Sequence, residues 1–200
     1  MKPKKGSLLI LIGLLLIAAA FSIIGYNLWE EHRASQSANS VVIHLESAAP
    51  DTQLLSEPEI PDHILNPNME MPTEQINGRD FIGVLEIPSL GLELPVVSQW
   101  SYPALKVAPC RYDGSAYTDN LIIAAHNYKS HFAKLKNLEL GETVIFTDVD
   151  ANTFTYEAAS KETLAPTDIE EMKSGDWDLT LFTCTYAGQH RITVRCERES

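Results

Sequence analysis

The pattern of hydrophobic and polar residues divides the chain into three parts. Residues 7–28 are 22 consecutive residues without a charge. At about 1.5 Å per residue, a helix of this length spans the roughly 30 Å hydrocarbon core of a bilayer. Residues 29–75 are mostly polar and carry prolines, a composition typical of a tether; the prolines are Pro50, Pro58, Pro61, Pro67 and Pro72. We therefore expect an anchor at 7–28, a linker at 29–75 and a folded domain at 76–200.

Short apolar runs in the folded part predict β-strands with little helix. Segments 81–88 and 92–97 flank a Ser-Leu-Gly turn, and segments 143–147 and 153–158 flank a polar turn. Residues 121–125 form a continuous apolar run that is short enough for a buried strand. Many short strands indicate an all-β barrel or sandwich.

Two segments near the C-terminus bring a thiol and a guanidinium together. Residues 179–184 and 191–196 both alternate in polarity and are separated by a six-residue stretch that contains one Gly. If this stretch closes a hairpin, Cys184 and Arg191 lie opposite each other. A guanidinium beside a thiol favours the thiolate and can stabilise an oxyanion on an attacked carbonyl. His126, at the exit of the 121–125 run, is the candidate base. From the residues alone, a catalytic Cys184 and a small, buried, structural Cys184 both remain open.

Other residues compete for these roles. Arg195 shares a strand face with Arg191 but lies about 13 Å further along the strand, too far from the thiol. His131 is a rival base, but it falls within an expected short helix at 131–138. His190 belongs to the loop and is expected at the rim of the site.

Composition and residue spacing limit which partners, disulfides and metal ions we expect. The net charge of −12 argues against a nucleic-acid partner. Three cysteines are too few for a disulfide scaffold, although Cys110 and Cys196 could pair outside the cell. His32 and His63 have no second ligand at metal spacing, so we expect surface histidines. Residues 148–152 begin like a calcium loop but lack its Gly and Glu, so we expect a hairpin turn and no bound metal.

The N-terminus indicates how the chain is oriented. Lys2, Lys4 and Lys5 precede the apolar run and predict a cytoplasmic tail at 1–6, a single span, and the remainder outside the membrane. The alternative is a cleaved signal peptide, because Ala18, Ala19 and Ala20 offer a small-residue cleavage site. Both alternatives place the folded domain outside the cytoplasm.

Four segments, in order, resemble one family. Thr180-Leu181-Phe182-Thr183-Cys184 matches the Thr-Leu-x-Thr-Cys signature of the sortases, which are membrane-anchored cysteine transpeptidases of Gram-positive bacteria. Residues 124–127 resemble the family's Ala-Gly-His segment, with Ala125 in place of the usual glycine. Residues 131–135 resemble its His-Phe-x-x-Leu stretch, and residues 81–97 resemble its first two strands.

This resemblance implies a closed eight-stranded sortase-type barrel with short helices, preceded by a transmembrane helix. It implies that Cys184 is the nucleophile, His126 the acid/base and Arg191 the oxyanion stabiliser. Thr183 and Tyr186 are expected at the peptide groove, although the sequence does not separate lining from packing.

The implied reaction cleaves a Leu-Pro-x-Thr-Gly-like sorting signal after Thr through an acyl-thioester. The implied partners are surface proteins with a C-terminal sorting signal and the amine of a lipid II-type peptidoglycan precursor, and no cofactor is required.

The resemblance is closest to a housekeeping or related small class of sortase. The connection from 162 to 179 is short, whereas haem-uptake sortases usually carry a long helix there. Glu57-Pro58-Glu59 lacks the Asp-Pro-aromatic motif of the pilin-class lid. Two other functions stay open: a tethered cysteine endopeptidase in which water resolves the thioester, and a non-catalytic cell-surface binding module.

Overall fold

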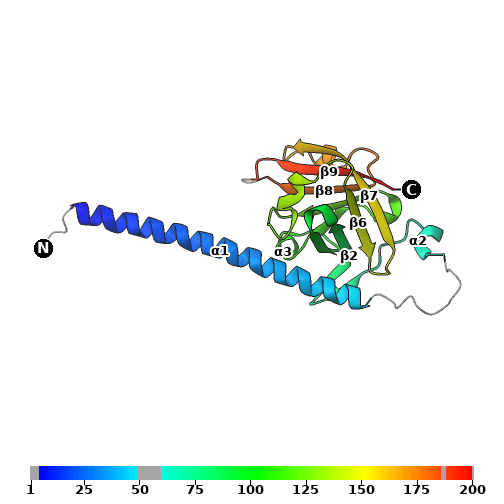
Figure 1. Cartoon of the computed structure of the whole chain (residues 1–200), viewed down its shortest axis with the longest axis horizontal. Helices are drawn as coiled ribbons and strands as arrows, with labels where there is room; N and C mark the ends of the chain where they lie inside the picture. The colour runs from blue at the N-terminus through cyan, green and yellow to red at the C-terminus, as the bar shows by residue number, and fades with distance from the viewer. Residues whose placement is uncertain (1–4, 49–59, 186–187, 200) are drawn as a thin grey trace.

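A long N-terminal helix and a closed β-barrel make up the structure (Figure 1). The computed structural model describes residues 5–48, 60–185 and 188–199. Strands are hydrogen-bonded in the order β1-β2-β3-β4-β5-β8-β9-β7-β6, and an additional β2–β6 pairing closes the barrel. Strand β1 extends the sheet outside this ring, so the barrel itself has eight strands, and the predicted all-β barrel is confirmed.

The elements have the following bounds. The strands are β1 (Glu74–Ile76), β2 (Arg79–Ile87), β3 (Leu92–Val97), β4 (Cys110–Asp113), β5 (Leu121–Ala125), β6 (Thr143–Asp148), β7 (Thr153–Leu164), β8 (Leu179–Cys184) and β9 (Arg191–Arg198). The α-helices are α1 (Lys5–Ala48), α2 (Asp62–Leu65), α3 (Tyr102–Leu105) and α4 (Ile169–Lys173), and the 3-10 helices are η1 (Pro88–Leu90), η2 (Ala116–Thr118) and η3 (Phe132–Asn137).

Barrel closure depends on one glycine in β2. At Gly83 the backbone has φ of +154°, and a Cβ there would lie 2.1 Å from the Thr147 carbonyl oxygen. Any side chain would therefore collide with β6 at the seam where β2 and β6 pair. The bulge between Phe81 and Gly83 in the β2–β3 register lies at the same place.

Strand alternation produces two apolar layers. Leu179, Leu181 and Val194 face the barrel interior, where they join the larger core cluster. Phe182 lies on the other side of β8, in a second cluster on the outer face that includes Ile122, Ala124 and Met172. The outer face of β5 and β8 is thus apolar as well, and this apolar surface extends to the ends of these strands.

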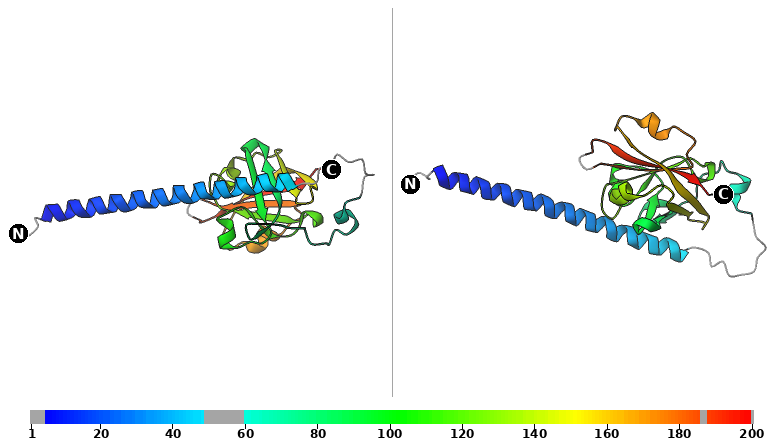
Figure 2. Two further views of the ribbon diagram at one scale, coloured as in Figure 1. Left: turned by 90° about the horizontal axis from the view of Figure 1, so that it is seen from below. Right: turned by 45° about the horizontal axis from the view of Figure 1, so that its top comes forward.

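Helix α1 corrects the predicted boundaries. It runs without interruption to Ala48, so the linker prediction is wrong for residues 29–48. Its second half presents small and branched apolar side chains at helical spacing, and these pack on the barrel beside β2 and β3 (Figures 1 and 2); they are Ala34, Ala38, Val41, Val42 and Leu45. The folded domain also starts before residue 76, because Met71 is buried in the barrel core.

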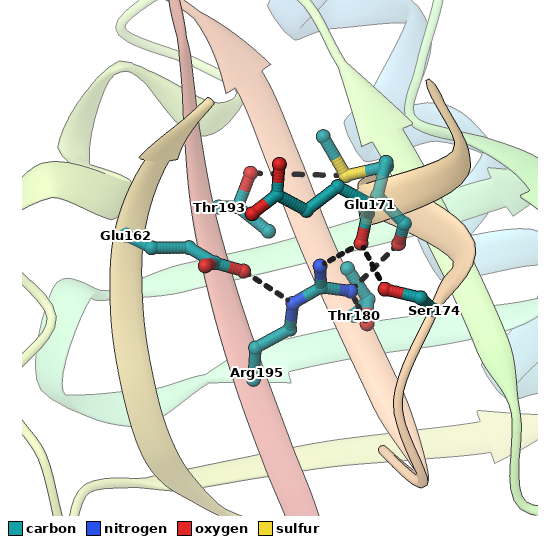
Figure 3. A network of polar contacts seen from close by, with 7 residues as sticks. Glu162, Glu171, Ser174, Thr180, Thr193 and Arg195 are labelled. Atoms are coloured by element: carbon teal, nitrogen blue, oxygen red, sulfur yellow. Dashed lines mark hydrogen bonds and ion pairs between the residues drawn. The ribbon is translucent and has the colours of Figure 1, made fainter. Parts of the chain in front are cut away.

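Arg195 ties three strands to α4 (Figure 3). It is 3% exposed, and its Nε donates to Glu162 Oε1 on β7 at 2.7 Å. Nη1 donates to the Met172 carbonyl at 2.6 Å and to Thr180 Oγ1 on β8 at 3.0 Å, and Nη2 donates to the Glu171 carbonyl at 2.7 Å. The guanidinium therefore satisfies two carbonyls of α4 while it holds β9 against its neighbours.

We predict that Arg195→Met lowers the free energy of unfolding by about 2–4 kcal/mol, because the Met172 carbonyl and the Glu162 carboxylate lose the guanidinium that donates to them. The matched control is Arg198→Met on the same strand. Arg198 pairs with Asp119 at the surface, and such a pair contributes about 0–1 kcal/mol. Chemical unfolding of the detergent-solubilised full chain measures both, and equal losses for the two variants would contradict the structural role of Arg195.

Candidate active site

Three neighbouring strands bring His126, Cys184 and Arg191 to one end of the barrel. Strands β5 and β8 are parallel and pair Ala125 with Thr183. His126 and Cys184 are the next residues along these two strands. Strands β8 and β9 are antiparallel and pair Cys184 with Arg191. These pairings align the three residues in one row, and the next row on the same face of the sheet consists of Ala124, Phe182 and Thr193.

Cys184 is the exposed thiol of the chain. All three cysteines are free, and Cys110 and Cys196 are buried. Burial raises the pKa of each of these two thiols to about 12, so neither reacts as a thiolate at neutral pH. Cys196 lies in the barrel interior and Cys110 in the outer layer, so the possible disulfide between them is not formed.

Arg191 lies on the same face of the sheet as Cys184. Its guanidinium carbon is 5.6 Å from the centre of the Phe182 ring, and Phe182 is two residues before Cys184 on β8. A cation over an aromatic face is held by the ring quadrupole. The half-buried Arg191 is thereby held on the face that carries Cys184, whereas the rival Arg195 is fully occupied by its own network.

His126 is half-buried at the exit of β5. Burial lowers its pKa below the usual value; the Glu30 carboxylate raises this pKa and the Lys106 ammonium lowers it, both by smaller amounts. The imidazole is therefore neutral at pH 7 and can accept a proton. The rival His131 is fully buried, and burial lowers its pKa to about 4, so it has no access to a substrate.

The expected groove residues lie in different places. Thr183 is 1% exposed, and its hydroxyl donates to the Ala125 carbonyl at 2.9 Å. It therefore holds β8 to β5 beneath the site and does not line a groove. Tyr186 lies outside the described residues. His190 is exposed at the rim, and its backbone N–H donates to Thr185 Oγ1 at 3.2 Å.

A row of aromatic rings leads away from the site, a feature that strand patterning did not reveal. Phe182 meets Tyr112 edge-on at 5.2 Å, and Tyr112 meets Trp100 at 6.0 Å. Trp100 and Tyr112 line a cavity of about 460 Å³. An ion pair of 2.5 Å between Lys173 and Asp113 joins α4 to β4 beside these rings. The three rings therefore form a connected aromatic row on the outer face, from Trp100 to Phe182, which is two residues before Cys184.

The calcium-like loop is a hairpin turn, as the sequence predicts. Asp148 Oδ1 accepts from the backbone N–H groups of Asp150 and Asn152 at 2.9 Å each, and Oδ2 accepts from the Tyr117 hydroxyl at 2.6 Å. These bonds occupy the carboxylate. His63, expected on the surface, instead stacks on Tyr117 at 4.7 Å. In the described part of the chain, no three His, Cys, Asp or Glu side chains are grouped to hold a metal ion.

Solved structures with the same fold are sortases. Sortase C1 from Streptococcus suis is 27% identical with a TM-score of 0.53, and the match covers 60% of this chain and 73% of that one. The sortase D5 transpeptidase of Clostridium perfringens is 23% identical with a TM-score of 0.55, covering 64% and 83%. Listeria monocytogenes sortase A is 17% identical with a TM-score of 0.55, covering 60% and 88%, and at these lower identities the likeness concerns the fold alone.

The comparison with curated proteins gives no match. The family model of the sortase domain matches residues 85–199, which is more than half of the chain and includes the row of His126, Cys184 and Arg191. The chain therefore belongs to the sortase family of cysteine transpeptidases.

Proposed function

We propose that this protein is a membrane-anchored sortase that cleaves a Leu-Pro-x-Thr-Gly-like sorting signal after Thr and transfers the new carboxyl end to an amine of a lipid II-type peptidoglycan precursor. The observation that carries the proposal is the β5–β8–β9 register, which aligns an exposed thiol with an imidazole and a guanidinium. The partners would be surface proteins that bear such a C-terminal signal.

Each residue has a defined task in this reaction. His126 accepts the proton of Cys184 while the sulfur attacks the Thr carbonyl carbon, and Arg191 donates hydrogen bonds to the oxyanion that forms. The Thr–Gly C–N bond then breaks, His126 returns the proton to the departing amine, and an acyl-thioester remains. An acceptor amine attacks this thioester, loses a proton to His126 and releases Cys184.

Helix α1 supports the same proposal. Among the described residues, α1 is long and apolar enough to cross a membrane, which is consistent with a single-pass anchor. The lysines at positions 2, 4 and 5 favour a cytoplasmic N-terminus and a catalytic domain outside the membrane.

For the class of sortase, we propose a housekeeping or related small class. The β7–β8 connection carries a five-residue helix, α4, and not a long one. The similar structures include sortases A, C and D5 at nearly equal TM-scores, so they give no support for excluding the pilin class. Glu57-Pro58-Glu59, on which that exclusion rests, lies outside the described residues.

We expect the full chain, incubated with a Leu-Pro-x-Thr-Gly peptide, to carry a mass adduct on Cys184 that ends at Thr. Cys184→Ala should abolish both adduct and cleavage. Arg191→Met should lower kcat by about 10²–10³-fold, the usual cost of losing one oxyanion donor. Arg198→Met, on the same strand but at its far end, is the matched control and should cleave at the wild-type rate. Wild-type cleavage by Arg191→Met would remove Arg191 from the mechanism.

Transfer and hydrolysis are separated by adding an amine. We expect an oligoglycine acceptor to convert most of the product into the ligated peptide, because the amine attacks the thioester faster than water does. Product that remains the free acid at every amine concentration, measured by mass spectrometry, would assign the chain as an endopeptidase.

The pH dependence follows from the burial of His126. Because burial lowers the pKa of this imidazole, the acid limb of the kcat/KM profile should have its midpoint below about 6.5, the value of a free histidine. Activity is then lost as the pH falls through that midpoint and His126 becomes protonated in the free enzyme. A midpoint above 7 would contradict a buried His126 as the group that titrates.

A further inference from the structure

The anchor helix contacts the catalytic end of the barrel through two consecutive glutamates. Glu30 Oε1 accepts from Lys106 Nζ, just after α3, at 2.9 Å. Glu31 Oε1 accepts from the backbone N–H of Lys129 at 2.9 Å. Lys129 belongs to the loop between β5 and η3, which begins with His126. Both glutamates therefore connect the helix to the surroundings of one catalytic candidate.

The two glutamates lie directly after the apolar run of α1. They are the first charged residues after the uncharged run that ends at residue 28. The packing of α1 on the barrel starts at the same turn, because Glu30 and Glu31 are half-buried and Ala34 and Ala38 are buried. Helix and barrel are thus in contact from the end of the apolar run onward.

The orientation of the barrel relative to α1 agrees with these contacts. In all three views, the C-terminal end of β8 and the start of β9 point toward the N-terminal half of α1 (Figures 1 and 2). The candidate active site therefore faces the apolar half of the helix. The opposite end of the barrel lies beside the C-terminal end of α1.

The loop after His126 is closed by backbone hydrogen bonds of its own. His126 is the first residue beyond β5, and its carbonyl accepts from the Phe132 N–H at 3.2 Å. The Tyr128 carbonyl accepts from the N–H of His131 at 2.9 Å, and the Tyr128 ring lies 4.9 Å from the His126 ring. These bonds close the loop on itself, whereas the Glu31 bond attaches it to another element.

Charges from several elements face His126. Glu30 on α1 raises its pKa and Lys106 lowers it. Tyr128 and His131 lie in its own loop, and the β8–β9 register brings Cys184 and Arg191 to its other side. The ion pair between Glu30 and Lys106 therefore places two opposite charges near the imidazole, and removal of either one has an effect of known sign.

We propose that Glu30 and Glu31 are positioning residues, so that the anchor helix supports His126 and forms part of the catalytic apparatus. The inference deepens the proposed sortase function and rests on it. Glu31 fixes the loop through the Lys129 N–H, and Glu30 fixes Lys106 and adds a negative charge near His126. Catalytic geometry and membrane attachment then share one structural element.

The first test concerns geometry and uses the detergent-solubilised full chain with a Leu-Pro-x-Thr-Gly peptide. Glu31→Ala removes the acceptor for Lys129 N–H and should lower kcat by about fivefold to twentyfold while KM stays unchanged. Glu31→Gln keeps an acceptor oxygen at the same place and should restore most of the rate. Glu197→Gln, an exposed glutamate at the far end of β9, changes the charge equally and should have no effect.

The second test concerns the field and does not need peptide turnover. Cys184 is the one exposed thiol, so the rate of its alkylation by iodoacetamide against pH reports the titration of His126 as an inflection that His126→Gln removes. Glu30→Gln should move this inflection to lower pH, because a negative charge is lost. Lys106→Met should move it to higher pH, because a positive charge is lost, while both variants lower kcat.

The outcomes separate the two proposals. A wild-type chain that cleaves no sorting peptide would overturn the proposed function, and opposite shifts of the alkylation inflection would still support the positioning role. Glu31→Ala with wild-type kcat, or an inflection that neither Glu30→Gln nor Lys106→Met moves, would overturn the positioning role. The thermal stability of Glu30→Gln is compared with that of Lys106→Met, because the two residues lie on different elements.

Discussion

The parallel pairing of β5 with β8 is the constraint on which the rest of the structure depends. It brings together residues 58 positions apart. The Thr183 hydroxyl donates a hydrogen bond of 2.9 Å to the Ala125 carbonyl and so stabilises this register. A slip of one residue would turn Cys184 to the barrel interior and Thr183 to the outer face. The apolar residues Leu179 and Leu181 oppose such a slip, because it would expose both of them. The packing of the core therefore determines the side on which the thiol emerges.

The same register explains how two arginines on one strand have different tasks. Arg195 is opposite Thr180, where α4 and β7 supply acceptors that surround its guanidinium. Arg191 is opposite Cys184, at the end of the sheet, where its neighbour is the face of Phe182. Burial with four hydrogen bonds makes the first a structural residue. An aromatic neighbour does not occupy the N–H donors of the second, which is consistent with the oxyanion role proposed for Arg191.

Local patterning was sufficient for most strands and for the row of candidate residues, because alternation and register are properties of short segments, whereas the short strands β1 and β4 were not predicted. The closed barrel predicted from residues 76–200 is confirmed, while the roles of Cys184, His126 and Arg191 stay a proposal. Long-range contacts were not foreseen. Residues 30–48 look like a tether because they are mostly polar and residues 35–40 lack large apolar groups, and their helix is stabilised by packing on β2 and β3. The bonds of Glu30 and Glu31 have no signal in local sequence at all.

This difference between a tether and a helix changes what the anchor does. A flexible linker of 47 residues (29–75) would have an end-to-end distance of about 35–40 Å, so the site would sample many heights and orientations above a bilayer. Helix α1 instead joins the barrel at Glu30, two residues beyond the apolar run, and its buried residues hold the orientation. Under the proposed function, with the apolar half of α1 in a membrane, the thiol would stay close to the surface where a lipid-linked amine and a membrane-retained sorting signal are presented. A fixed height would then raise the effective concentration of both proposed substrates without any additional contact to them.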